Sequence, residues 1–254
     1  MSAPILPGCE PFSFDGGRTG VLVLHGFTGN PRSMRGIADR MADAGMSVEM
    51  PLLPGHGTVL DDMIPMRFVD WTSAAEHAYE TLAARTDHVV VLGLSMGGTL
   101  TCWLAETHPE IAAIVLVNPL VEPVAAEMVE GLTALQESGI ETFDAIGSDI
   151  AKEGVVEMSY PGTPVAAAFS LFEGVEGVAK NLSAISCPVL LFSSEVDHVV
   201  SPSNGPFLVE RVSGPIERVL LERSFHVATM DHDAEFIEVE AVAFVERIAS
   251  QRTS

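Results

Sequence analysis

The sequence predicts an α/β fold in which helices wrap a mostly parallel central sheet. Short runs rich in Val, Leu and Ile alternate with helix-length segments along most of the chain, which is the order expected of such a sheet. The runs are almost continuously apolar, which is typical of strands buried on both faces. The 254 residues, of which 47% are hydrophobic, suffice for one domain with its own core, without disulfides or metals.

Turn residues mark the expected elements in chain order. The segments with the composition of strands are 20–25, 46–50, 88–93, 112–118, 188–193 and 217–221. The segments with helical patterns, each opened or closed by Pro, Gly, Ser or Asp, are 31–44, 70–85, 96–107, 203–212 and 233–250. The helices needed to cover a sheet are therefore present.

The strand pattern stops from about residue 119 to residue 186. Apolar residues recur there at helical spacing, at Met128, Leu132 and Leu135 and again at Val165, Phe169 and Phe172. We interpret 119–186 as an inserted cap on a core formed by 1–118 and 187–254. Most of these side chains are expected to pack the cap onto the core, and some are candidates for lining a pocket.

Composition narrows the partners and the compartment. A formal net charge of −22 argues against binding to nucleic acid or to an anionic membrane surface. The odd number of cysteines, Cys9, Cys102 and Cys187, with no C-x-x-C spacing predicts free thiols in a reducing compartment. No signal peptide or membrane-spanning run is recognisable, so a soluble cytoplasmic protein is expected. The histidines lack metal-ligand spacing, so neither a metal nor an organic cofactor is predicted.

The motif G-L-S-M-G at 93–97 is the strongest chemical signal. It lies between an expected strand and an expected helix, where a sharp turn would expose the hydroxyl of Ser95 as a nucleophile. Gly93 and Gly97 would let the strand and helix approach closely. The alternative is a tight strand-to-helix turn with an incidental serine.

A serine nucleophile needs a base, and the base needs an acid that fixes its tautomer. Asp197 follows the strand 188–193 and His226 follows the strand 217–221, in the chain order serine, acid, base. The competing acid is Glu195, and the competing bases are His198 and His232. Asp231 and Asp233 are expected to cap the final helix instead.

An oxyanion hole is the second requirement of acyl transfer, since charge develops on the carbonyl oxygen. The backbone N–H of Met96 is the first expected donor, at the start of the helix after Ser95. The second is the N–H of Phe27 in H-G-F-T-G-N at 25–30, after the first strong strand. The alternative for H-G is a plain turn.

Taken with L-P-G-H-G at 53–57, D-H-V-V at 197–200 and H-V-A-T-M-D at 226–231, these motifs give the chain a family likeness. Over nearly its whole length it resembles bacterial monoacylglycerol lipases and related carboxylesterases of the α/β-hydrolase fold. The resemblance implies ester hydrolysis through an acyl-enzyme on Ser95 and a small cap over an apolar acyl tunnel. It also implies that Glu157, in E-M-S-Y-P-G-T-P at 157–164, contacts the glycerol; the alternative is a solvated surface glutamate.

Several functions fit these residues. The leading one is hydrolysis of monoacylglycerols to fatty acid and glycerol, with a transient contact between cap and lipid surface. A general short- to medium-chain carboxylesterase acting on another monoester or a lactone would use the same triad. A non-catalytic ligand-binding protein of this fold is the alternative from another class, and a complete triad argues against it. Aspartate-nucleophile enzymes of this fold resemble the chain less, because the elbow carries a serine.

Overall fold

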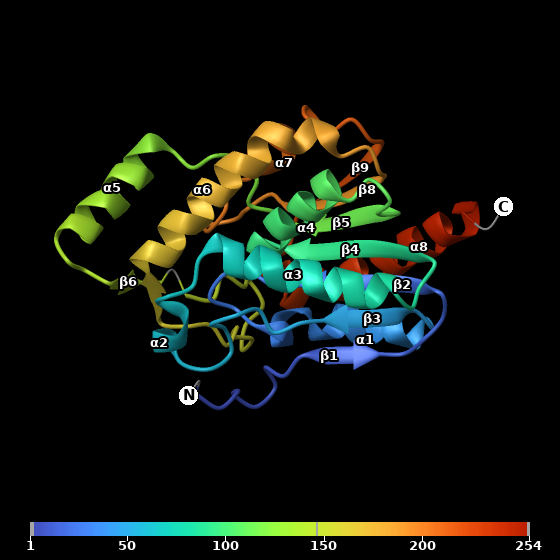
Figure 1. Cartoon of the computed structure of the whole chain (residues 1–254), viewed down its shortest axis with the longest axis horizontal. Helices are drawn as coiled ribbons and strands as arrows, with labels where there is room; N and C mark the ends of the chain where they lie inside the picture. Colours follow the sequence, from blue (N-terminus) through green and yellow to red (C-terminus); the bar gives the residue numbers. More distant parts are fainter. Residues whose placement is uncertain (1–2, 146, 253–254) are drawn as a thin grey trace.

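A seven-stranded sheet runs through the centre of the molecule (Figure 1). The computed structural model describes residues 3–145 and 147–252. Neighbouring strands pair in parallel except β1, which pairs antiparallel with β3 at one edge. The prediction of a mostly parallel sheet is confirmed. In spatial order the strands are β1 (Phe12–Phe14), β3 (Ser47–Met50), β2 (Thr19–Leu24), β4 (His88–Leu94), β5 (Ala113–Val117), β8 (Val189–Ser194) and β9 (Ile216–Leu221).

Helices follow the strands at the predicted places. The sequence did not predict β1 or the short α2. The 3-10 helices are η1 (Pro31–Met34), η2 (Leu182–Ala184) and η3 (Ala228–Met230). The α-helices are α1 (Arg35–Asp43), α2 (Leu60–Met63), α3 (Phe68–Ala83), α4 (Met96–Thr107), α5 (Ala126–Glu137), α6 (Val165–Asn181), α7 (Asn204–Val209) and α8 (Ala234–Arg252).

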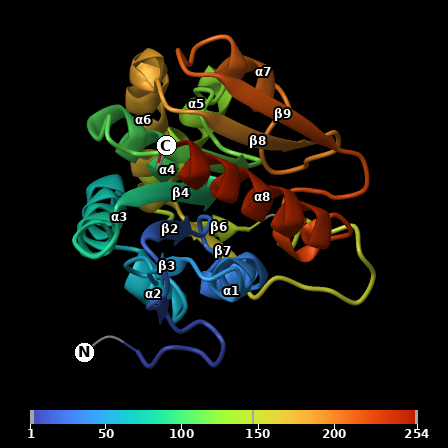
Figure 2. The ribbon, with the colours of Figure 1, turned by 90° about the vertical axis from the view of Figure 1, so that its right-hand side faces the viewer.

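Two apolar layers lie on opposite faces of the sheet, because successive side chains of a strand point to opposite faces. Leu22 and Leu24 of β2 belong to the core cluster shared with α3 and α4. Val21 and Val23 of the same strand belong to the cluster shared with α1 and α8. Figure 2 shows α3 on one side of the strands and α1 and α8 on the other. Burial on both faces explains the continuous apolar runs of the central strands.

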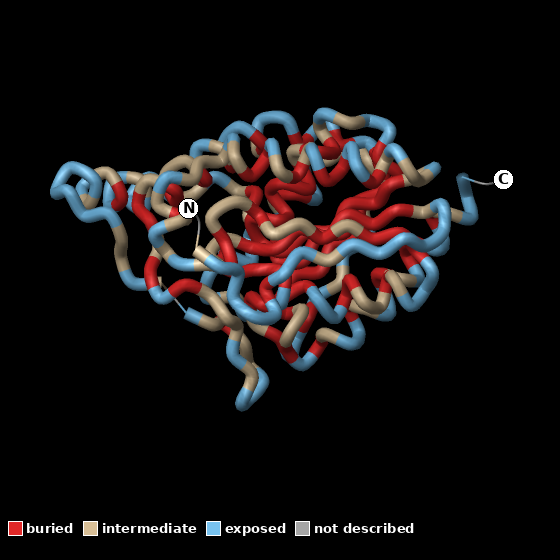
Figure 3. Tube along the Cα trace, turned by 60° about the horizontal axis from the view of Figure 1, so that its bottom comes forward, coloured by how far each residue is buried: buried red, intermediate tan, exposed pale blue. Residues whose placement is uncertain are grey.

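The expectation of burial on both faces is wrong for the segment 217–221. It forms β9, whose residues are mostly exposed or half-buried, and Leu220 is 50% exposed. The reason is its position, since β9 is the last strand of the sheet and pairs only with β8. Figure 3 shows the contrast between the buried central strands and the exposed periphery.

The segment between β5 and β8 contains two long helices, as the helical spacing predicted. It also holds a small antiparallel pair of strands, β6 (Thr142–Asp144) and β7 (Gly162–Pro164). Leu132 of α5 packs with Val165 and Ala168 of α6 in a separate apolar cluster, and α6 in turn packs on α3 and α4. In Figure 1, α5 lies at the edge of the molecule, away from the central sheet. The division into core and cap stays a prediction.

Candidate active site

Ser95 occupies a strained turn between β4 and α4. Its φ of 56° and ψ of −117° place a non-glycine residue in a backbone region that costs conformational energy. A methyl group at Gly93 would lie 2.1 Å from the carbonyl oxygen of Gly97, and one at Gly97 would lie 2.1 Å from that of Leu24. Both glycines are therefore required for β2, β4 and α4 to meet at this turn.

The loop after β2 lies directly against Ser95. A methyl group at Gly26 would be 3.4 Å from Cβ of Ser95, so the loop passes within van der Waals distance of the serine. Within the described ranges, no group accepts a hydrogen bond from the backbone N–H of Phe27. The N–H of Met96 lies in the first turn of α4, where backbone donors have no partner within the helix. Two backbone donors thus adjoin the serine.

Two buried histidines support this loop. The Nδ1 atom of His25 lies 3.0 Å from the carbonyl oxygen of Gly26, and its Nε2 accepts the backbone N–H of Leu53 at 3.1 Å. These bonds select the neutral imidazole with its proton on Nδ1. Burial lowers the pKa of His25 to about 3, helped by the nearby His56, and burial lowers the pKa of His56 to about 4.

We expect acid to destabilise the fold through these two imidazoles. In the unfolded chain each has a pKa near 6.5 and would bind a proton at pH 5, whereas in the folded protein each stays neutral there. Since the unfolded state binds more protons, their stabilising contribution is complete above about pH 6.5 and declines as pH falls. Each should lower the free energy of unfolding by about 2 kcal/mol between pH 7.5 and pH 5.

Urea denaturation of wild type and His56→Gln at both pH values measures this effect. On acidification, the free energy of unfolding of the variant should fall by about 2 kcal/mol less than that of wild type. The many carboxylates affect both proteins equally, so their contribution drops out when the two losses are subtracted. His77→Gln, which removes an exposed histidine on α3, is the matched control and should behave as wild type. Equal losses in wild type and His56→Gln would contradict the assignment.

Asp197 and His226 are brought together by the ends of β8 and β9. Nδ1 of His226 lies 2.7 Å from Oδ2 of Asp197, and their side chains are only 7% and 2% exposed. The other oxygen, Oδ1, accepts the backbone N–H groups of Val199 at 2.9 Å and Val200 at 2.7 Å. The carboxylate is therefore held by its own loop and directed at the imidazole.

The competing residues from the sequence lie elsewhere. Glu195 and His232 are exposed. His198 directs its Nδ1 at Oδ1 of Asp149, at 2.7 Å. Of the acids and bases considered, the structure brings only Asp197 and His226 together.

A pocket of about 230 Å³ opens beside Ser95 and His226, which both line it. Gly26 and Phe27 of the loop after β2 also line it, so this loop and the serine share one cavity. Much of the wall is apolar and comes from the segment predicted as a cap, including Val124, Met128, Phe143, Leu171 and Phe172. Met128 and Phe172 belong to the apolar stripes recognised in the sequence.

Glu157 lies in the same pocket rather than at the open surface. Its Oε1 would be 2.8 Å from a methyl group at Gly29, so the carboxyl group lies over the loop after β2. Burial raises the pKa of Glu157, opposed by the charge of His226 and a hydrogen bond from Ser33. A solvated surface glutamate does not describe this residue.

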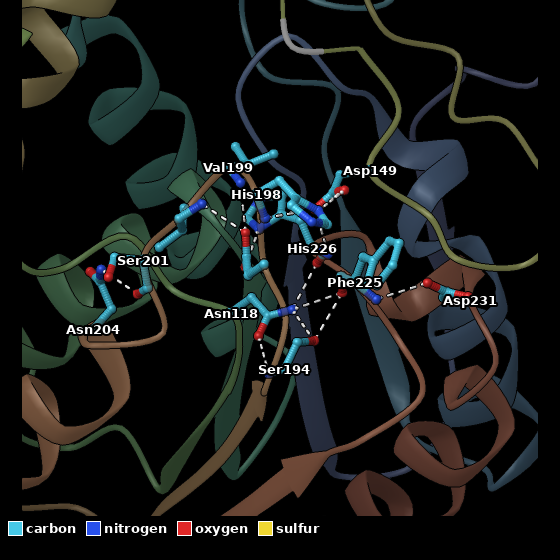
Figure 4. Close-up of polar contacts among 12 residues, drawn as sticks. Asn118, Asp149, Ser194, His198, Val199, Ser201, Asn204, Phe225, His226 and Asp231 are labelled. Atoms are coloured by element: carbon cyan, nitrogen blue, oxygen red, sulfur yellow. Dashed lines mark hydrogen bonds and ion pairs between the residues drawn. The ribbon is translucent and has the colours of Figure 1, made fainter.

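The sequence reasoning missed a polar network around His226, which Figure 4 shows. Asn118 follows β5, and its Nδ2 donates to the carbonyl oxygen of His226 at 2.8 Å and to Oγ of Ser194 at 2.9 Å. Its Oδ1 accepts the N–H of Ser194 at 2.7 Å. A polar residue directly after a buried strand was the available signal. Asp149, which also contacts His226, lies in a loop without any such pattern.

Asp231 and Asp233 do not act as the predicted side-chain caps of α8. The carboxylate of Asp231 accepts the backbone N–H groups of Ala151 at 2.7 Å and Phe225 at 2.9 Å. That of Asp233 binds the side chains of Arg223 and Ser224. Both residues stabilise the loop that carries His226. Their partners lie outside α8, so no local sequence pattern indicates this role.

Two further kinds of feature were sought in residues 3–145 and 147–252, namely metal-binding clusters and membrane-spanning helices. No group of three or more His, Cys, Asp or Glu side chains in these ranges is arranged to hold a metal ion. None of the helices in the same ranges combines the length and hydropathy needed to cross a bilayer.

A serine on a strand-to-helix turn, sharing a pocket with a histidine that binds an aspartate, defines the α/β-hydrolase class, and comparisons with known proteins agree. Residues 20–137 match the family model of the alpha/beta hydrolase fold. The chain is 41% identical to a thermostable monoacylglycerol lipase of Bacillus sp. (strain H-257), over 95% of this chain and 96% of the relative. It is 24% identical to a carboxylesterase of Bacillus subtilis (strain 168), over 94% and 97%.

Solved structures support the same assignment. One reported for the metagenome-derived lipolytic enzymes LipS and LipT superposes with a TM-score of 0.92 at 40% identity, covering 96% of this chain and all of that chain. A Paleococcus ferrophilus monoacylglycerol lipase shares the fold, with a TM-score of 0.73 at 17% identity over 94% and 99%. The chain belongs to the monoacylglycerol lipase and carboxylesterase family of α/β-hydrolases, and it is a carboxylic ester hydrolase. The predicted enzyme class is thereby confirmed, and the non-catalytic alternative is set aside.

Proposed function

We propose that this enzyme hydrolyses monoacylglycerols to fatty acid and glycerol through an acyl-enzyme on Ser95. The observation that carries the proposal is the shared pocket, in which Ser95 and the Asp197-bound His226 adjoin an apolar wall. A pocket of this kind combines a nucleophile and its base with space for an acyl chain. The 41% identity to a relative named as a monoacylglycerol lipase supports the substrate class.

Each catalytic group has a distinct step. Oγ of Ser95 attacks the ester carbonyl carbon while Nε2 of His226 takes its proton, and Asp197 keeps the Nδ1 proton in place and stabilises the imidazolium. The N–H groups of Phe27 and Met96 donate to the oxyanion of the tetrahedral intermediate. The intermediate expels the glycerol oxygen, which receives the proton from His226. Water activated by His226 then attacks the acyl-enzyme and releases the fatty acid.

The proposed cap, residues 119–186, supplies the parts that distinguish one ester from another. Its apolar side chains would hold the acyl chain, because burying each methylene contributes about 0.8 kcal/mol. Glu157, on the same segment, would bind a hydroxyl group of the glycerol. Its half-buried position in the wall of the pocket supports this role.

Replacing Glu157 by alanine should lower kcat/KM for a monoacylglycerol by about tenfold, because one hydrogen bond to a hydroxyl group would be lost. The ethyl ester of the same fatty acid has no free hydroxyl and should be affected less than about twofold. The measurement is a chain-length series of kcat/KM for monoacylglycerols and matched ethyl esters, with wild type and variant. Equal losses on both ester types would contradict a glycerol contact.

The same series tests the second candidate, a general carboxylesterase of short- to medium-chain esters or lactones. The relative named as a carboxylesterase in Bacillus subtilis favours it. A wild-type enzyme that prefers short esters and ignores the glycerol group would support this candidate and leave the serine mechanism in place.

The proposal extends to the lipid surface that the enzyme contacts and to the compartment in which it works. Met128 and Val156, on the proposed cap, are 55% and 70% exposed, and we propose that they make transient contact with a lipid surface. Such contact would be apolar in origin, since the net charge of −22 is repelled by anionic lipids. A reducing cytoplasm suits the three cysteines, which are buried free thiols.

A further inference from the structure

Asp149 is a buried carboxylate outside the triad that contacts both loops carrying the proposed acid and base. It lies between β6 and β7 and is 8% exposed. Its Oδ2 accepts two backbone N–H groups, those of His198 and of His226, each at 3.1 Å. Its Oδ1 lies 2.7 Å from Nδ1 of His198. Burial acts to raise the pKa of this carboxyl, but the hydrogen bonds from His198 and His226 and the charge of His198 together outweigh it and lower the pKa.

The contacts hold His226 by its main chain from two sides. Asp149 accepts its N–H, and Nδ2 of Asn118 donates to its carbonyl oxygen at 2.8 Å (Figure 4). The residue after Asp197 is His198, whose N–H binds the same Asp149 oxygen. One atom of Asp149 therefore fixes the loop of the acid relative to the loop of the base. The bond between His226 and Asp197 depends on that relative position.

A second carboxylate offers a natural comparison. Asp231 also joins the segment 149–152 to the loop of His226, through the N–H groups of Ala151, Lys152 and Phe225 at 2.7–2.9 Å. Its hydrogen bonds reach neither His226 nor the loop of Asp197. Removing Asp231 therefore loosens the same two segments without releasing the base directly.

We propose that Asp149 is a positioning residue. Through it, the segment predicted as a cap holds the loop of Asp197 and the loop of His226 in the relative position that catalysis needs. The inference rests on the proposed function, because it presumes that His226 is the base. The proposed role of Asp149 depends on the position of its oxygen atom and not on its charge, because one oxygen accepts both backbone N–H groups. An asparagine can present its amide oxygen to the two N–H groups and its amide nitrogen to Nδ1 of His198.

The test compares Asp149→Ala, Asp149→Asn and Asp231→Asn. Displacing a catalytic group by about 1 Å can cost about a hundredfold in rate, so Asp149→Ala should lower kcat for p-nitrophenyl butyrate at least tenfold. KM should change less than about threefold, because the substrate pocket remains. Asp149→Asn should recover kcat to within about threefold of wild type, as should Asp231→Asn, although Asp231→Asn lowers the melting temperature.

The rate at which a fluorophosphonate labels Ser95 should follow kcat across the series, because labelling also needs the base. The inference would be overturned if Asp149→Ala had the same kcat and the same labelling rate as wild type. It would also be overturned if Asp231→Asn were as slow as Asp149→Ala. If Asp149→Ala does not fold, Asp149→Ser is used in its place, because the serine hydroxyl is too short to bridge both loops. The same results are expected for Asp149→Ser, and the same outcomes would overturn the inference. Failure of wild type itself to hydrolyse the ester or label at Ser95 would instead refute the proposed function.

Discussion

Replacing Ser95 by alanine is expected to lower kcat for ester hydrolysis by about a millionfold, because no other group could form the acyl-enzyme. Alanine removes only Oγ from a residue held by the turn between β4 and α4, so the fold should be unchanged. Steady-state kinetics measures the loss. Labelling by a fluorophosphonate, followed by identification of the modified residue by mass spectrometry, checks its cause.

A matched control separates this effect from the loss of any hydroxyl group. Ser73→Ala removes an exposed serine of α3 and should keep wild-type activity and labelling. If Ser95→Ala still hydrolysed esters at more than about a hundredth of the wild-type rate, the nucleophile would have to be sought elsewhere.

Replacing Asp197 by asparagine should lower kcat by about ten thousandfold with little change in KM. The structure gives the reason. Because Val199 and Val200 direct their N–H groups at one oxygen, the amide oxygen of asparagine must take that place. The amide nitrogen would then face Nδ1 of His226 as a donor and force the ring proton onto Nε2. In that tautomer the imidazole cannot accept the proton of Ser95.

The competing acid supplies the control for this experiment. Glu195→Gln, at an exposed position two residues earlier, should leave kcat within about twofold of wild type. The pair of variants is measured on one soluble ester across pH 6–9. A damaging Glu195→Gln together with a mild Asp197→Asn would reverse the assignment of the acid.

Much of the fold was predictable because the central strands are buried on both faces. Continuous apolar runs, as in Val89–Leu92, mark such strands without knowledge of the rest of the chain. The strand β1 was missed because its three residues, Phe12–Phe14, are exposed or half-buried and lie at an edge. The pair β6 and β7 was missed for a similar reason, since each strand has three residues and pairs only with the other.

The residues of the candidate site also differ in how far the sequence could predict them. Ser95, Asp197 and His226 were predictable because each follows a recognisable strand, and strand ends in a parallel sheet converge at one edge. Asp149 was not, because its partners, His198 and His226, lie far along the chain and its loop has no periodicity. The half-buried position of Glu157 in the pocket was equally hidden. Its carboxyl group lies over Gly29, a contact that no local pattern in 157–164 records.

The order of strands has a consequence for how the enzyme acquires activity. Ser95 follows β4, whereas Asp197 and His226 follow β8 and β9, which join the sheet only across the segment between Val117 and Val189. Asp197 and His226 both lie beyond this segment. A chain in which β8 and β9 are not yet paired with β5 would contain the nucleophile turn without the acid and base beside it, so hydrolysis requires that this half of the sheet is in place.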